Sequence, residues 1–455
     1  MQKEIKRVLF YAYQPRFFRS SLLGNLYEIA QVYPVILLSE ELDSKTQEIL
    51  QDKKLFPKIE KIIPVNQYSD SAEKMNLFKK NKYFCNLAKE IIDNYKPDIV
   101  IATGGNFFES YLRRFARQIN ALNLVFARNL IGTSQQRMKE YVVNVAYAKL
   151  PHFFPYWAKI LFFKIKLYLG QLFCFWLLPL LIGQKPFLNE LSYVLRADTS
   201  RFRGVDYFIV FSKQNYYILK GDGVPAERIY ILAHPLLREQ VKGFLKETYY
   251  SNIQFAKENN EKVITVMWRS GESFSFRRDN DSLIPKEEIL KSSVEVVKLL
   301  ATILKEWRIF IKPHPRIQEI AKLEKTELEE LLKPVSELIE VTDPRDPLEK
   351  YLTISDVMAG LSPSSAAIYD AYLNKPEKPI LVLDLHQEFS GDAYKDFDGI
   401  EYIDNKEKLI SILEAISDGK YHKKEKNKKD NEEVNSKEFP NAIEMLEFLY
   451  EKRRN

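Results

Sequence analysis

Short apolar runs alternate with helix-length amphipathic segments along most of the chain. In the second half, apolar runs predict strands at 338–341, 356–361 and 379–384, and helical spacing predicts helices at 346–353 and 366–373. Strands that alternate with helices indicate a parallel sheet with right-handed crossovers. Ligands of such sheets bind beyond the carboxyl ends of the strands. We therefore look for chemistry in the loops that follow these strands.

The same alternation fills the first half of the chain. Apolar runs predict strands at 7–13, 32–39, 59–65, 97–103, 122–127 and 205–211, and one that ends at 234–235. Helical spacing predicts helices at 20–31, 75–95 and 107–120, and one that ends at 220. The pattern is typical of a Rossmann-like domain, so the expected fold class is α/β.

The expected domains are residues 1–235 and 236–417, with a boundary between His234 and Glu261. At 455 residues the chain is long enough for two domains of ordinary size. A stretch rich in Lys, Glu and Asn at 418–438 is typical of a solvated linker. A terminal amphipathic helix is expected within 439–455.

An apolar segment at 141–189 contains no acidic residue. Within it, residues 167–184 are uncharged, and this length borders on the roughly 20 apolar residues that span a bilayer. Its lysines and aromatic residues favour interfacial or re-entrant helices on an anionic membrane surface. A hydrophobic lid or a dimer interface is the alternative, and a complete span is least favoured.

The composition is that of a globular protein, with 45% hydrophobic and 29% charged residues and a formal net charge of +6. No basic motif interleaved with aromatic residues indicates a nucleic-acid partner. The two cysteines, Cys85 and Cys174, lack zinc spacing and are typical of a reducing compartment. The charged start of the chain leads directly into a strand, so we expect no signal peptide.

Cationic and hydroxyl side chains follow three consecutive strands of the second half. They are Arg269, Ser270, Gly271 and Glu272 after the first strand, Lys312, His314 and Arg316 after the second, and Ser364 and Ser365 before a helix. Cations, and the free N–H groups at the start of a helix, both favour a phosphate. Each motif taken alone is equally compatible with a capped helix or a solvated loop, but together they predict an anion site.

The first half carries one similar loop. Gly104, Gly105 and Asn106 follow a buried strand and lead into a helix, so a ligand could approach backbone N–H groups there. A tight turn alone is the alternative. Glu109 in the first turn of that helix is a candidate catalytic base, although a carboxylate favoured by the helix dipole is the more frequent case.

The sequence resembles the GT-B superfamily. The resemblance rests on the order GVPAERIYILAHP, a strand with RSGE, a strand with KPHPR, and DPLEKYLTISDVMAGLSPSSAAIYDA. It is nearest to bacterial capsule and surface-polysaccharide transferases and CDP-glycerol glycerophosphotransferases, and the UDP-GlcNAc 2-epimerases share the architecture. The resemblance implies two Rossmann-like domains facing a cleft, with an apolar helical insert in the first, and it places the end of the first domain at the phrase GVPAERIYILAHP. It also implies that the loops of the second domain hold the phosphates of an activated sugar and that the first domain, with Gly104–Asn106, faces the acceptor.

The main functional prediction is a glycosyltransferase on the cytoplasmic face of the bacterial inner membrane. It would move a sugar from a nucleotide-sugar donor to a lipid-linked or polysaccharide acceptor. His314 would protonate the leaving group or, as we prefer, bind its phosphate, and the cationic loops would stabilise the leaving phosphate with no metal or cofactor required. The alternatives are a CDP-polyol glycerophosphotransferase, a sugar-nucleotide 2-epimerase and a non-catalytic scaffold. The apolar segment counts against the epimerase.

Overall fold

The computed structural model describes most of the chain. The described residues are 4–12, 22–39, 42, 44–65, 77–103, 107–127, 165, 169, 177, 204–221, 223–250, 261–269, 275–276, 283–284, 286–313, 318–361, 366–374, 377–387, 394, 397–422 and 437–454. They form two compact units, here called unit 1 (residues 1–241 and 433–455) and unit 2 (residues 242–432). The chain passes from unit 1 into unit 2 within helix α11 (Glu239–Tyr250).

Unit 1 is built on an eight-stranded sheet with the order β16-β7-β6-β5-β4-β1-β2-β3, in which every neighbouring pair is parallel. Its strands are β1 (Val8–Ala12), β2 (Val35–Ser39), β3 (Ile59–Pro64), β4 (Ile99–Ala102), β5 (Leu122–Ala127), β6 (Tyr207–Val210), β7 (Ile229–Leu232) and β16 (Glu438–Phe439). Its helices are α1 (Leu23–Val32), α2 (Ser44–Gln51), α4 (Leu77–Tyr95), α5 (Phe107–Gln118), α10 (Lys213–Gly221) and α17 (Ala442–Arg454), with the 3-10 turns η6 (Ala226–Arg228) and η7 (Pro235–Leu237). Both faces of the central strands are buried, which explains their continuous apolar runs.

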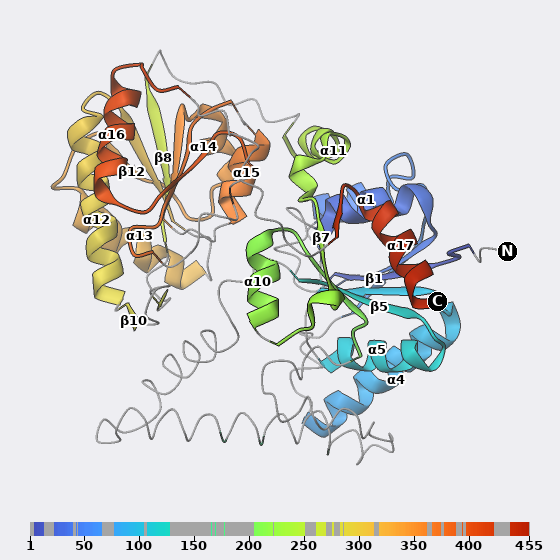
Figure 1. The fold of residues 1–455 in the computed structure, drawn as a ribbon. Helices are drawn as coiled ribbons and strands as arrows, with labels where there is room; N and C mark the ends of the chain where they lie inside the picture. Colours follow the sequence, from blue (N-terminus) through green and yellow to red (C-terminus); the bar gives the residue numbers. More distant parts are fainter. Residues whose placement is uncertain are drawn as a thin grey trace. The chain divides into compact units, whose positions relative to one another are not determined.

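Unit 2 has a six-stranded parallel sheet with the order β12-β11-β8-β13-β14-β15. The strands are β8 (Val263–Met267), β11 (Arg308–Lys312), β12 (Ile339–Val341), β13 (Val357–Gly360), β14 (Ile380–Leu383) and β15 (Ile400–Ile403), and β9 (Ser275–Phe276) pairs antiparallel with β10 (Leu283–Ile284). The helices are α12 (Lys286–Ile303), α13 (Gln318–Leu332), α14 (Leu348–Ile354), α15 (Ala366–Asn374) and α16 (Lys406–Ser417). α12 and α16 lie on one side of the sheet, and α14 and α15 lie on the other (Figure 1).

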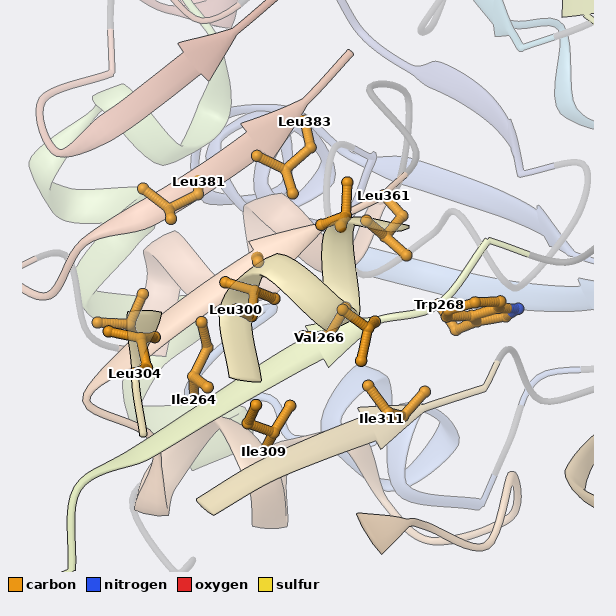
Figure 2. Close-up of a cluster of buried hydrophobic side chains, with 14 of the residues drawn as sticks. Ile264, Val266, Trp268, Leu300, Leu304, Ile309, Ile311, Leu361, Leu381 and Leu383 are labelled. Atoms are coloured by element: carbon orange, nitrogen blue, oxygen red, sulfur yellow. The ribbon is translucent and has the colours of Figure 1, made fainter. Parts of the chain in front are cut away.

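Alternate strand residues form the core of unit 2. Ile264 and Val266 of β8 pack with Ile309 and Ile311 of β11 and with Leu300 of α12, all of them almost completely buried (Figure 2). The intervening residues of the same strands face the opposite layer. Fully burying one such side chain contributes about 1.5–3 kcal/mol, so these pairs fix the register of the sheet.

The predicted fold class is largely confirmed by this architecture. Both units are α/β, and their sheets are separate. Helices α2, α11, α12 and α13 are absent from the sequence prediction. At the end of the chain, Phe439 pairs with Leu232 as part of β16, and the terminal helix α17 begins at Ala442.

The apolar segment 141–189 lies outside the described residues except for 165, 169 and 177. The predicted membrane-associating helices are therefore not tested by the described residues. Within the ranges that the structure describes, no helix is both long and apolar enough to cross a membrane.

Candidate functional site

The two sheets share one strand order. Numbered from the first strand of each unit, both run third, second, first, fourth, fifth, sixth, and unit 1 adds β7 and β16. In this topology the chain leaves the first and fourth strands toward opposite sides, and the crevice at their carboxyl ends is where nucleotides bind. The crevice of unit 2 lies beyond β8 and β13, and that of unit 1 lies beyond β1 and β4.

Arg269 lies at the crevice of unit 2. The Leu361 amide donates to the Met267 carbonyl at 3.1 Å, and the Trp268 amide donates to the Lys312 carbonyl at 2.9 Å. These bonds continue the sheet past its strands and fix the backbone just before Arg269, whose side chain is half-buried. The other predicted residues of these two loops, Ser270, Gly271, Glu272, Ser364 and Ser365, lie outside the described residues.

Gly360 explains how a helix can begin so close to this crevice. A Cβ atom at this last residue of β13 would lie 3.2 Å from Cδ1 and Cγ1 of Ile368 in α15 and 3.5 Å from Cε of Met267. Glycine therefore lets α15 pack directly on the end of the strand. Gly360 was not predicted from the sequence, although a glycine inside a strand pattern is a signal for such a close approach.

Lys312 lies at the end of β11, and its side chain is directed toward β12. Its Nζ donates to the carbonyls of Pro344 at 2.8 Å, Asp343 at 3.1 Å and Pro313 at 3.5 Å. Burial lowers the pKa of Lys312 to about 8. From the sequence, Lys312 was predicted to bind a phosphate. In the structure its Nζ instead bonds backbone carbonyls, and those of Asp343 and Pro344 lie on the side of β11 away from β13. His314 and Arg316 lie outside the described residues.

The loop after β12 folds around Asp343. The Asp343 carboxylate accepts from the backbone N–H of Arg345 at 2.8 Å and from its guanidinium at 2.9 and 3.1 Å. These bonds hold the pKa of Asp343 well below its usual range. The Tyr351 hydroxyl donates to Asp346 at 2.5 Å. The turn is thus ordered by its own side chains and is tied to Lys312 on one side and to α14 on the other.

Glu109 is completely buried in α5. Its carboxylate accepts from the Arg113 guanidinium at 3.3 Å and from the Thr103 amide at 3.4 Å, and Arg113 is equally buried. A carboxylate enclosed with its counter-ion favours the structural role over that of a general base. Gly104, Gly105 and Asn106, which precede α5, lie outside the described residues.

A further cluster was not predicted from the sequence. His386 follows the carboxyl end of β14, with its Nε2 2.6 Å from Oγ of Ser292 and its Nδ1 3.6 Å from Oε1 of Glu288. Nearby, the buried carboxylate of Asp384 accepts from the Tyr402 hydroxyl at 2.5 Å. Ser292 and His386 are 94 residues apart in the chain, so no local motif could have signalled their meeting. In the described part of the chain, no group of three or more His, Cys, Asp or Glu side chains could hold a metal ion.

Comparison with known proteins supports the fold. No family model and no curated protein matches the sequence. Among solved structures, the UDP-GlcNAc 2-epimerase from Methanocaldococcus jannaschii matches 98% of this chain and 99% of its own, with a TM-score of 0.53 and 13% identity. A putative UDP-N-acetylglucosamine 2-epimerase from Listeria monocytogenes matches 91% of this chain and 88% of its own, with a TM-score of 0.50 and 12% identity.

A third structure is HepE from Anabaena in complex with UDP and glucose. It matches 91% of this chain and 91% of its own, with a TM-score of 0.51 and 10% identity. At these identities the likeness concerns the fold alone. It confirms the predicted GT-B-like architecture of two α/β units with parallel sheets. The apolar helical insert is not part of what is confirmed.

Proposed function

We propose that this chain is an enzyme acting on a nucleotide-activated sugar and that unit 2 binds the nucleotide. The parallel sheet of unit 2 ends in a crevice of the kind that binds nucleotides, and Arg269 follows the strand at its centre. Of the three similar structures, two are named for UDP-GlcNAc epimerisation and the third was solved with UDP and glucose. Both observations point to the same class of ligand.

The reaction that we propose is 2-epimerisation of a UDP-sugar. The observation that carries this choice is the match of nearly the full chain to the epimerase from M. jannaschii, with almost equal coverage of both proteins. Epimerisation breaks the C2–H bond of the sugar and rebuilds it on the opposite face, so the site must accept one proton and return another. It needs no acceptor substrate, which separates it from glycosyl transfer.

The phosphate-binding role proposed for the loops of unit 2 fits this reaction as well as glycosyl transfer. Arg269, with Ser270, Gly271 and Glu272 of the same loop, would serve the diphosphate. His314, Arg316, Ser364 and Ser365 would complete this group. Removing the guanidinium with Arg269→Ala is expected to weaken UDP binding by about 1.5–3 kcal/mol, the contribution of a hydrogen bond to a charged group.

Arg308 offers a matched control for Arg269. It is a half-exposed arginine at the opposite, amino-terminal edge of the same sheet, where it pairs with Glu340 at 2.6 Å. Arg308→Ala should leave UDP affinity unchanged. Equal affinities for wild type, Arg269→Ala and Arg308→Ala would remove Arg269 from the site.

Incubation with UDP-GlcNAc in deuterated water tests the reaction. We expect the C2 epimer to form without any acceptor and deuterium to enter at C2, both observed by proton NMR. A thermal-shift panel of CMP, CDP, UDP and GDP, each with its sugar or polyol conjugates, tests the donor, because a bound nucleotide raises the melting temperature by mass action. Stabilisation by CDP-polyols instead of UDP would favour the glycerophosphotransferase, and nucleotide binding with no turnover would favour a scaffold.

A membrane-associated glycosyltransferase is the second candidate, favoured by the acid-free apolar segment 141–189. Each basic side chain near an anionic bilayer contributes on the order of 1 kcal/mol. We propose that this segment docks the protein on the cytoplasmic leaflet. Full-length protein should then sediment with anionic liposomes at low salt, and deletion of residues 155–183 should abolish this while UDP binding persists. Failure of the full-length protein to sediment would leave the lid or dimer role.

A further inference from the structure

Three neighbouring loops of unit 2 meet the nucleotide crevice or lie beside it, and one buried lysine connects two of them. β11 lies between β8 and β12, so the loop after β11 adjoins the crevice on one side and the loop after β12 on the other. Lys312 ends β11, and it is only 5% exposed. Its side chain reaches across to the loop after β12, residues 343–346.

The hydrogen bonds account for the whole ammonium group. A lysine ammonium has three N–H donors and no acceptor. Three backbone carbonyls surround Nζ: Pro313 belongs to the loop after β11, and Asp343 and Pro344 belong to the loop after β12. Nζ could bind a phosphate only by giving up its bond to one of these carbonyls.

The surrounding charge also disfavours a phosphate at Nζ. The carboxylates of Asp343 and Asp346 in the loop, and of Glu349 on α14, all act to raise the pKa of Lys312 against the larger effect of burial, which lowers it. The Asp343 carboxylate itself interacts with the positive charges of Arg345, in the same loop, and of Lys325 on α13. Three carboxylates therefore already lie near the one ammonium group of Lys312, and they would repel an additional anion.

We propose that Lys312 is a positioning residue, which fastens the loop after β12 to the end of β11 and so preforms this edge of the nucleotide site. The inference rests on the proposed function for its role in binding, but the bracing itself does not. Without the lysine, the three carbonyls would lose their bonds to Nζ, and the turn at 343–346 would lose its side-chain tie to the end of β11, so more of its ordering would fall to the ligand. Ordering a loop on binding costs affinity, and preorganisation avoids that cost.

Lys378 provides a matched control. It is a partly buried lysine of unit 2 whose Nζ, like that of Lys312, bonds a backbone carbonyl, here that of Ser355, and it lies 3.5 Å from the carboxylate of Asp356. These partners immediately precede β13, at the amino-terminal edge of the sheet away from the crevice. Replacing Lys378 removes a similar brace at a place where no nucleotide role is expected.

The first test measures hydrogen exchange of the Arg345 and Asp346 amides, which bond to the carboxylate and the carbonyl of Asp343. In Lys312→Met these amides should exchange roughly tenfold faster, because a net hydrogen bond of a charged group is lost from the turn. In Lys378→Met they should exchange as in wild type. Unchanged exchange in a folded Lys312→Met protein would overturn the brace, whether or not the protein binds UDP.

The second test measures UDP affinity by calorimetry. We expect Lys312→Met to bind UDP roughly tenfold more weakly, Lys312→Arg to recover part of the loss and Lys378→Met to match wild type. Wild-type binding of UDP with no loss in Lys312→Met would refute the positioning role. Absence of UDP binding by wild type, together with faster exchange in Lys312→Met, would refute the proposed function and retain the brace.

The pH dependence of UDP affinity separates this role from a merely structural one. Because the pKa of Lys312 is about 8, the amine loses one donor as the pH rises from 7 to 8.5. UDP affinity of wild type should fall in this interval. Global stability should not fall with it, since the lysine of the unfolded chain holds its proton more tightly and linkage then favours the folded state at higher pH. Flat wild-type affinity, or the same fall in Lys312→Met, would contradict the proposal.

Discussion

A single buried imidazole makes the stability of unit 1 sensitive to acid. His234 follows β7, and its Nδ1 accepts from the Leu236 amide at 3.3 Å, so its proton belongs on Nε2. Burial, with a smaller effect of the Arg238 charge, lowers the pKa of His234 to about 3. An unfolded histidine titrates near 6.5. Between these values the unfolded chain binds a proton that the folded chain does not, so stability falls as the pH is lowered through this window.

We expect His234 alone to cost about 2–3 kcal/mol of unfolding free energy between pH 7 and pH 4.5. His234→Asn keeps a side-chain acceptor before η7 and removes the titration, so urea unfolding should show a shallower pH dependence in this variant. His422→Asn is the control, because His422 is exposed. Parallel pH profiles for wild type and His234→Asn would show that His234 is not the buried neutral group described here.

The Glu109–Arg113 pair gives a residue-scale test of the two roles considered for Glu109. Removing one member of a buried ion pair leaves the other charge uncompensated, at a cost of about 3–5 kcal/mol. We therefore expect Glu109→Gln to unfold at clearly lower urea concentration, and Glu109→Leu combined with Arg113→Met to recover much of the loss. A Glu109→Gln protein with wild-type stability and no turnover would instead identify Glu109 as catalytic.

Gly360, at the end of β13, sets how closely helix α15 can pack against that strand. In Gly360→Ala the new methyl group would meet Ile368 at 3.2 Å, so we expect a loss of about 1–3 kcal/mol from overpacking, partly recovered by Ile368→Val. Gly243 is the opposite case, since nothing lies within 4 Å of a Cβ there and it sits inside α11. Gly243→Ala should stabilise by about 0.5–1 kcal/mol. Chemical denaturation of both variants measures these changes. Stability changes of the same sign in Gly360→Ala and Gly243→Ala would refute the packing argument.

The sequence predicts some elements of this fold far better than others, for physical reasons. The central strands are buried on both faces and show as continuous apolar runs, so β5 was predicted residue for residue at 122–127. β16 has only two residues and exists because Glu438 and Phe439 pair with the edge of β7, an interaction that no local pattern encodes. In the site, the cationic residues after strands can be recognised locally. The direction of the Lys312 side chain cannot, because its acceptors lie 31 and 32 residues further along.

At the scale of the whole molecule, unit 1 is completed by the end of the chain. Helix α17 buries Met445, Leu446 and Leu449 completely, and β16 adds a strand to the sheet. Polar contacts reinforce the packing. The Ala442 amide donates to Glu28 at 3.0 Å, the Tyr33 hydroxyl to Glu447 at 2.9 Å, and the Tyr450 hydroxyl to Asp98 at 3.3 Å. Unit 1 therefore cannot reach its final packing until the whole of unit 2 has been made.

Removing residues 437–455 should consequently destabilise unit 1 and spare unit 2. Three fully buried apolar side chains contribute about 1.5–3 kcal/mol each, a sum comparable with the entire stability of an ordinary domain. Hydrogen exchange should show lost protection of the Val8 amide, which bonds to Pro34, and retained protection of the Arg308 amide, which bonds to Lys262 in unit 2. Leu449→Ala, with an expected cost of about 2–5 kcal/mol, should give an intermediate result in unit 1. Unchanged protection of Val8 after the truncation would mean that the first 241 residues form a complete unit without the terminal helix.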